Sequence, residues 1–499
     1  MSSTRLTYRF GPLERRGILG PVRAGQALLL AVGALVAIAT LDQAPTASGA
    51  LLATALFAGA VVGAVAPIGS RTVEEWTPVA ISFAWKHLRR RARWQSNLPT
   101  SGLRARRRAD AREFELGQSP PVAPPELGGV RIIHADYRDR PIGVLSERSG
   151  RRLTAVLACR VVAFSLLDPE AQEQRLARWG LVLSGAASTA IRRIQWVERT
   201  APAEGDELAR WLHAERDPTI PLRGTPMIES YLELVGATAR VTQQHEILIA
   251  VQVDSGRVRD RDGNGITRAL IEVTERIAQG LEGAEVIVLG ALSPGQLAHA
   301  LRTAFDPYAR AELAALEVAD PSRAGLSEAN AWPLGAREAW DHYSSDGAVH
   351  ATYWIGGWPR VDVSPMFMEA LLGRSSTVRT VAVTFEPIPP ERSTREVEAA
   401  ITRDRADSEL RHRFGQSETA RQRQAQDATV RREAELAAGH GEVRLAGFVT
   451  VSGRDRDDLR RASAEVSEHA ARARLELHRM YGQQGDAFTF TLPLCRGLR

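Results

Sequence analysis

Two long apolar stretches lie close together near the N-terminus. They run from about Ala24 to Leu41 and from about Ala50 to Ile68, and neither contains a charged residue. Each approaches the ~20 apolar residues that a helix needs to cross a bilayer, whereas a helix in a soluble core seldom lacks charge on every face. Eight residues, DQAPTASG, separate them. The pattern predicts a transmembrane hairpin; the alternative is a helical hairpin buried in a soluble core.

Basic residues flank the two stretches and predict their orientation. Five arginines precede the first stretch, none lies in the connecting loop, and a dense basic run follows the second. Because cytoplasmic flanks are enriched in Lys and Arg, we expect a two-span plasma-membrane protein with both termini in the cytoplasm. A cleaved signal peptide is disfavoured, since the first stretch is long and a second follows at once.

The residues behind the second stretch mix aromatic and basic side chains. Thr77-Pro78 is typical of a helix start, and we expect residues 72–94 to form a helix in the headgroup region. Basic side chains near a membrane surface attract anionic lipid; the alternative is that they only fix the topology. The basic residues expected to face lipid are Lys86, Arg89, Arg90, Arg91 and Arg93.

Strands and helices alternate through the rest of the chain. The predicted strands are Val130–Tyr137, Ile142–Ser146, Leu153–Leu167, Ile191–Thr200, Glu246–Asp254, Ala284–Leu289, Ala348–Ile355, Arg379–Pro387, Glu442–Ser452 and Ala487–Pro493. The predicted helices are Pro169–Ser184, one or two within 204–242, Thr267–Gln279, 364–372, 392–437 and 455–480. The helix at 392–437 is too poor in large apolar residues to be wholly buried, and Gly415 is expected to break it.

The two halves of this region echo each other. IQWVERTAP at 194–202 is matched by VAVTFEPIPP at 381–390, and VQVDSGR at 251–257 by VTVSGRD at 449–455. We therefore predict an α+β region of two tandem α/β-sandwich-like units with mostly antiparallel sheets, with chance similarity as the alternative. The expected parts are an arm at 1–23, the hairpin at 24–68, a juxtamembrane helix at 69–111, a Pro-rich linker at 112–130, and units at 131–325 and 326–499.

Composition limits the kinds of site and partner expected of this chain. Lys86 is the only lysine and lies in no Gly-x-x-x-x-Gly-Lys-Ser/Thr motif, so the sequence predicts neither a phosphate-binding loop nor Schiff-base catalysis. The net charge of +5 comes mostly from the juxtamembrane run, so no nucleic-acid partner is expected. The two cysteines, Cys159 and Cys495, fit a reducing compartment. Heavy Arg and Ala usage favours an actinobacterial source.

Candidate site motifs are weak. Asp260–Gly265 begins like a calcium-binding loop, but position 12 is Ile271, so we interpret it as a turn that caps a helix. His342 and His350 flank a polar turn and are expected to serve the loop, not a metal. No nucleophile–base set appears. The sequence therefore predicts no enzyme, cofactor or metal site.

The two ends of the chain carry a resemblance. The final strand and charged helix lead to a segment with Gln483, Gln484, Ala487, Phe488 and the turn Leu492-Pro493-Leu494. This pattern resembles the end of the N-terminal domain of type IV secretion ATPases of the CagE/TrbE/VirB group, including TraC. The front end, TYRFGPLERRG at 7–17 before two spans, is similar to the PrgI/VirB-type membrane subunit. Together they resemble actinobacterial two-span proteins of conjugative clusters that lack the motor domain.

That resemblance implies a non-catalytic inner-membrane subunit that anchors a conjugation or type IV secretion-like apparatus and docks a separate hexameric ATPase, within an oligomeric complex. The residues expected to dock the ATPase are Phe488, Phe490, Leu492, Pro493 and Leu494. The rival interpretation makes the two phenylalanines core residues of a strand. The alternative function is an EccE-like membrane component of a type VII secretion complex, and the type of motor gene nearby would separate the two.

Overall fold

The computed structural model describes residues 24–68, 71–96, 123–160, 164–202, 243–310, 328–413, 420–438 and 441–498, apart from single positions, with short pieces at 226–230 and 313. These residues form two compact units. One unit holds residues 24–92 and 396–432; the other holds 93–395 and 433–498. The predicted arm at 1–23 and most of the predicted linker at 112–130 lie outside the described residues.

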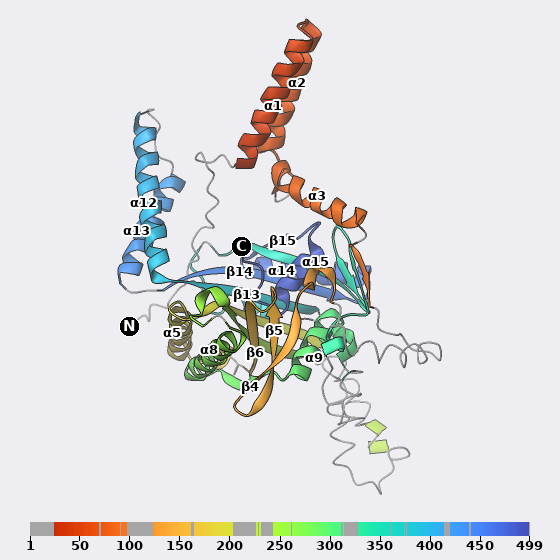
Figure 1. Ribbon diagram of the computed structural model, residues 1–499, viewed down its shortest axis with the longest axis vertical. Helices are drawn as coiled ribbons and strands as arrows, with labels where there is room; N and C mark the ends of the chain where they lie inside the picture. The colour runs from red at the N-terminus through yellow and green to blue at the C-terminus, as the bar shows by residue number, and fades with distance from the viewer. Residues whose placement is uncertain are drawn as a thin grey trace. The chain divides into compact units, whose positions relative to one another are not determined.

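Two apolar helices, α1 (Ala24–Gln43) and α2 (Ala47–Val65), form a hairpin and lie side by side (Figure 1). Small residues bring the helices together, because a Cβ added to Gly33 would collide with the side chain of Ala60. Gln26 Nε2 also donates a hydrogen bond to the carbonyl oxygen of Ala64 at 2.9 Å. The large apolar side chains point outward, and Leu51 is 74% exposed. By length and composition both helices are candidate membrane spans. The prediction of two apolar helices is confirmed.

The third helix of this unit differs from its prediction. Helix α3 (Val73–Leu88) begins five residues before Pro78, which therefore lies inside it. The start is fixed earlier because Glu75 Oε2 accepts a hydrogen bond from the backbone N–H of Thr72 at 3.1 Å. A short ladder of β1 (Pro67–Ile68) and β2 (Arg71–Thr72) precedes the helix. Since α3 ends at Leu88, the predicted helix over 72–94 is too long.

The other unit is built on one sheet of thirteen strands, and the strand pairs within it are antiparallel. Its strands are β3 (Arg93–Gln95), β4 (Arg131–Tyr137), β5 (Arg140–Glu147), β6 (Arg152–Arg160), β7 (Ile191–Pro202), β8 (Gln243–Asp254), β9 (Ile287–Ala291), β10 (Gly335–Glu338), β11 (Tyr343–Ser345), β12 (Ala348–Gly357), β13 (Val378–Ile388), β14 (Glu442–Gly453) and β15 (Glu476–Arg479). The predicted mostly antiparallel α+β region is confirmed.

The two halves of the sheet have corresponding strand orders when each is followed outward from the middle. One half runs β7-β8-β6-β5-β4 and the other β13-β14-β12-β11-β10, while β9 pairs with β6 and β15 with β12. The halves join where β7 pairs with β13, from Arg379 opposite Thr200 to Phe385 opposite Ile194. The two predicted units thus share a single sheet, and the matching sequence words lie on β7 and β13 and at the ends of β8 and β14. Whether the units arose as a tandem pair stays a prediction.

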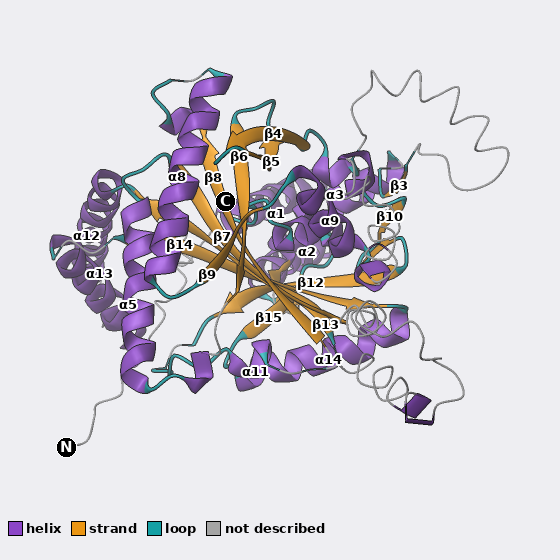
Figure 2. Ribbon diagram, turned by 90° about the horizontal axis from the view of Figure 1, so that it is seen from below, coloured by secondary structure: helices purple, strands orange, loops and turns teal. Residues whose placement is uncertain are grey.

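Helices cover one face of the sheet in two pairs. Helix α5 (Pro169–Ala186) packs beside α8 (Gly263–Gly283), and α11 (Glu369–Leu372) beside α14 (Arg456–Arg472), as Figure 2 shows. Alternate residues of the strands pack against these helices. Val251 of β8 and Leu270 of α8 lie in one core cluster, and Val449 of β14 and Val466 of α14 lie in the other. Asp262 caps α8 by accepting a hydrogen bond from the N–H of Gly265, which confirms the capping interpretation of the calcium-like motif.

The opposite face is covered by α9 (Pro294–Phe305) and by the C-terminal segment, residues 484–498, which begins with α15 (Gln484–Phe488). The predicted strand over Ala487–Pro493 is wrong, because α15 is followed by a 3₁₀ turn at Thr489–Thr491. Side-chain hydroxyls hold these turns: Thr489 Oγ1 donates to the carbonyl oxygen of Asp486 at 2.7 Å, and Thr491 Oγ1 to that of Phe488 at 3.0 Å.

Between β13 and β14 the chain forms two further helices, α12 (Pro390–Arg413) and α13 (Ala420–Ala437). Val397 and Ala400 are buried, whereas Val430 is exposed. Only a narrow apolar stripe of these two helices is therefore buried. The predicted break at Gly415 falls in 414–419, outside the described residues.

Candidate functional site

The C-terminal segment packs into the core of the sheet unit. Phe488, Leu492 and Leu494 are 2%, 1% and 0% exposed, and Pro493 is also buried. Phe490 is half-buried, with its ring centroid 4.9 Å from that of Phe448. Four of the five residues expected to dock an ATPase therefore lie inside the protein. This burial fits the rival interpretation that the aromatic residues belong to the core, although they do not lie on a strand.

Two glutamines of the central strands bind the backbone of this segment. Gln195 on β7 donates from Nε2 to the carbonyl oxygen of Phe490 at 2.7 Å and accepts from the N–H of Cys495 at 2.8 Å. Gln252 on β8 donates to the carbonyl oxygen of Leu494 at 3.2 Å. Irregular backbone in a core needs side-chain partners, because an unpaired buried amide costs ~1–3 kcal/mol. The amides thus fix the path of the segment across the sheet.

The second half of the sheet also contacts this segment. Gln484 of the segment accepts from the N–H of Thr352 on β12 at 2.8 Å and donates to its carbonyl oxygen at 3.3 Å. The hydroxyl of Thr450 lies 2.9 Å from that of Thr352 and 2.8 Å from that of Thr491. A polar belt on both halves of the sheet therefore supports the same segment.

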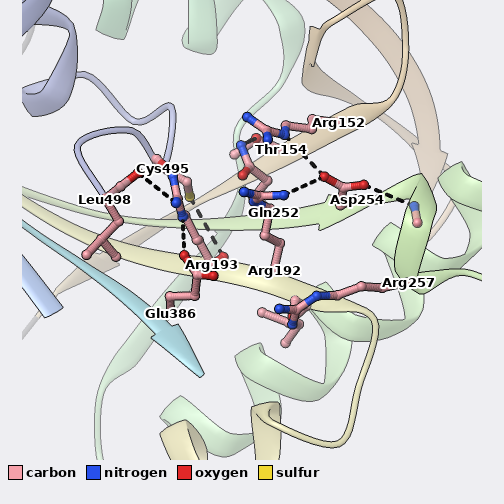
Figure 3. Close-up of polar contacts among 12 residues, drawn as sticks. Arg152, Thr154, Arg192, Arg193, Gln252, Asp254, Arg257, Glu386, Cys495 and Leu498 are labelled. Atoms are coloured by element: carbon pink, nitrogen blue, oxygen red, sulfur yellow. Dashed lines mark hydrogen bonds and ion pairs between the residues drawn. The ribbon is translucent and has the colours of Figure 1, made fainter. Parts of the chain in front are cut away.

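Two arginines complete the network. Arg193 is buried and donates to the Glu386 carboxylate at 2.9 Å and to the carbonyl oxygens of Cys495 and Leu498 at 3.2 and 2.7 Å (Figure 3). Arg496 donates from Nε to Glu147 at 2.8 Å and from Nη1 to the carbonyl oxygen of Glu126 at 2.8 Å. Buried ion pairs contribute little net stability but penalise any other arrangement. The arginines thus specify one position for the end of the segment.

Asp254 organises the end of β8 beside this network. Its carboxylate accepts from Arg152 Nε at 3.2 Å, from Arg192 Nη1 at 2.8 Å and from the N–H of Gly256 at 3.0 Å. Burial by itself would raise the pKa of Asp254, but these hydrogen bonds together lower it. Asp254 is therefore a carboxylate at neutral pH and holds the two guanidinium groups.

Burial keeps both cysteines and His350 in their neutral forms at neutral pH. Burial raises the pKa of Cys159 to about 12 and that of Cys495 further, and it lowers the pKa of His350 to about 4. His350 lies in β12, 2.8 Å from the hydroxyls of Ser345 and Ser452, so the prediction that it serves a loop is wrong. Within the described ranges no group of three or more His, Cys, Asp and Glu could hold a metal ion. This arrangement can position backbone, and the raised pKa values keep both thiols protonated at neutral pH.

The sequence interpretation missed the glutamines and arginines under the C-terminal segment. A signal existed, since Gln195 and Gln252 each lie between two apolar residues of a strand, as in IQW and VQV. Such a residue in a central strand needs a buried hydrogen-bond partner. The sequence could not show that the partner is backbone more than two hundred residues away.

The predicted membrane residues occupy different elements. Ala24 and Leu41 lie in α1 and Ala50 in α2, whereas Ile68 lies beyond α2 in β1. Their lipid contact stays a prediction.

The predicted lipid-facing basic residues are not on one helix. Lys86 lies in the last turn of α3, and the guanidinium of Arg89 lies 4.3 Å from the ring centroid of Trp85. Arg91 follows in a turn, and Arg90 is outside the described residues. Arg93 lies in β3, opposite Arg337 of β10, so it does not belong to the helix as predicted. A local sequence pattern cannot show that residues 93–95 pair with another strand, so Arg93 was wrongly predicted to lie in the helix.

Comparison with known families identifies one match. A family model described as "Putative type VII ESX secretion system translocon, EccE" matches residues 241–355. These residues run from the start of β8 into β12 and so include strands of both halves of the sheet. No curated protein matches the chain. The match overturns the resemblance to the conjugative and type IV secretion family, and the docking of a conjugative ATPase loses its basis with it. The chain is similar to a component of a secretion system at the membrane.

Proposed function

We propose that this protein is a membrane-anchored, non-catalytic subunit of a type VII secretion translocon. The observation that carries the proposal is the match of residues 241–355 to the EccE family model. It agrees with the two candidate membrane spans at the N-terminus, which a secretion component at the membrane requires. The type VII secretion component, which was the alternative function from the sequence, is therefore the function proposed.

The anchor is the hairpin of α1 and α2. Its outward side chains are large and apolar, and its inward ones are small, as expected for helices surrounded by lipid. From the basic flanks we infer a plasma-membrane protein with both termini in the cytoplasm and the loop around Thr46 outside. The part of α3 that bears exposed Ile81, Trp85 and Leu88 then lies in the headgroup region, with Lys86 and Arg89 toward anionic lipid.

The cytoplasmic part is a scaffold of two related units, 131–325 and 326–499. The matched strand order of the two halves supports this division. The buried thiols and the lack of a lysine beyond Lys86 support a structural rather than a catalytic role. Its partners are other subunits of the secretion apparatus, within an oligomeric complex.

Deletion of the gene tests the proposal in a host whose type VII substrates can be followed. We expect secretion of these substrates to stop and to return with the wild-type gene. Complementation with a gene that lacks the codons for residues 24–68 should fail although the protein is made. Normal secretion in the deletion strain would contradict the assignment, and restored secretion without the hairpin would contradict the anchor.

Topology is tested separately by cysteine labelling. The wild-type thiols are buried, so single cysteines introduced at Thr46 and Ser119 are the reactive ones. We expect an impermeant maleimide to label position 46 in intact cells and position 119 only after lysis. Labelling of position 119 from outside would reverse the orientation.

A further inference from the structure

Five arginines gather at one end of the sheet. The turn between β5 and β6 carries Arg148 and Arg151, and Arg152 begins β6. Arg192 lies at the start of β7 and Arg257 just after β8. The register brings these segments together, since Arg152 is opposite Asp254 and the carbonyl oxygen of Arg151 accepts from the N–H of Ser255. We call these residues the arginine cluster; Figure 3 shows Arg152, Arg192 and Arg257 around Asp254.

The arginine cluster carries more positive charge than its carboxylates balance. Asp254 is shared by Arg152 and Arg192, while Arg257 donates to the carbonyl oxygen of Ile191 at 2.6 Å. Glu147, opposite Arg152 in the strand register, is bonded to Arg496, and Glu386 is bonded to Arg193. The pKa of Arg152 is lowered by burial and then by the charges of Arg192 and Arg148. The arginines therefore repel one another, and an added negative charge would stabilise them.

The arginines of the cluster differ in exposure. Arg148 and Arg151 are exposed, whereas the side chains of Arg152 and Arg192 are only 15% and 25% exposed. Asp254 thus fixes two guanidinium groups at the surface, and fixed guanidinium groups suit bidentate binding of carboxylates.

We propose that the arginine cluster binds an acidic segment of a protein partner. A lipid surface fits less well, because the neighbours in the turns are polar or small: Ser149, Gly150, Ser255 and Gly256. Single-stranded nucleic acid fits less well because no aromatic side chain interleaves with the arginines for base stacking. Acidic segments are recognised by such arginine groups through charge-assisted hydrogen bonds. This inference does not depend on the secretion assignment.

The test uses the full chain in detergent and a fluorescein-labelled peptide of ten glutamates, with binding followed by fluorescence anisotropy at low salt. The variant Arg148→Gln/Arg192→Gln keeps the Arg152–Asp254 pair and removes two charges. The control Arg460→Gln/Arg461→Gln removes two exposed charges from α14. We expect Kd to rise about tenfold in the first variant, equivalent to ~1.4 kcal/mol, and less than twofold in the control. If the double variant melts early, Arg148→Gln alone should still raise Kd about threefold.

Three results would overturn the inference. One is a peptide that does not bind the wild type. Another is an equal loss of affinity in the cluster variant and the α14 control, which would show unspecific attraction. The third is tighter binding of a 20-nucleotide DNA strand, or of vesicles with 30% phosphatidylglycerol, that the cluster variant loses.

Discussion

Replacing His350 with Gln should remove part of the pH dependence of stability. The His350 ring is fully buried in β12 and lies 2.8 Å from the hydroxyls of Ser345 and Ser452 and 4.7 Å, between centroids, from the ring of Phe488. Burial lowers its pKa from 6.5 to about 4, because the interior disfavours the charged imidazolium. The folded protein therefore binds this proton less readily than the unfolded chain does.

The sign and size of the effect follow from linkage. Above pH 6.5 the histidine is neutral in both the folded and the unfolded state, and its full contribution to the free energy of unfolding is present. As the pH falls from 6.5 toward 4 the unfolded chain takes up the proton first, so the free energy of unfolding decreases. One pKa unit is equivalent to ~1.36 kcal/mol, so the loss between pH 7.5 and 5 is about 2 kcal/mol.

The assay is urea unfolding of the full chain in detergent at pH 7.5 and pH 5, followed by near-UV circular dichroism. Relative to wild type, His350→Gln should lose about 2 kcal/mol less on acidification, whatever its stability at pH 7.5. His134→Gln, at an exposed position of β4, is the matched control and should behave as wild type. Equal pH dependence in wild type and His350→Gln would refute the reasoning.

Further outcomes test the core and the chemistry. Phe488→Ala should reduce the free energy of unfolding by about 3–5 kcal/mol, and Phe490→Ala by less because Phe490 is only half-buried; equal costs in urea unfolding would contradict the packing. Gln195→Leu should cost about 2–4 kcal/mol by leaving the N–H of Cys495 and the carbonyl oxygen of Phe490 unpaired, which loss of hydrogen-exchange protection at Cys495 would report. Asp262→Ala should cost about 1 kcal/mol through loss of the α8 cap, and an unchanged urea midpoint would argue against that cap. The purified chain should not hydrolyse ATP, since its sequence contains no Gly-x-x-x-x-Gly-Lys-Ser/Thr motif; turnover lost on changing a residue within 131–499 would contradict this.

The spacing of apolar residues along the sequence predicted much of the fold. The two uncharged stretches gave α1 and α2, and alternating or continuous apolar runs gave β7, β8, β13 and β14 close to their observed bounds. The matching words around 194–202 and 381–390 correctly picked strands that occupy corresponding places in the sheet. Local sequence carries this information because burial on one or two faces sets the spacing of apolar residues.

Features that depend on distant partners could not be predicted. The segment 487–493 alternates like a strand, yet the carbonyl oxygen of Phe490 accepts from Gln195 and the hydroxyl of Thr491 bonds to that of Thr450, so the segment crosses the sheet instead of joining it. Arg93 looks like part of a basic helix until β3 pairs with β10. The type IV resemblance rested on a few residues at each end, whereas the family match lies in the middle of the chain.

Affinity purification of the tagged protein from solubilised membranes, with mass spectrometry of what is retained, tests the central claim most directly. The account predicts that other subunits of a type VII secretion translocon are enriched, and that a variant without residues 24–68 recovers them poorly. Enrichment of conjugative or type IV secretion subunits, or recovery of the protein in the soluble fraction without partners, would contradict the assignment.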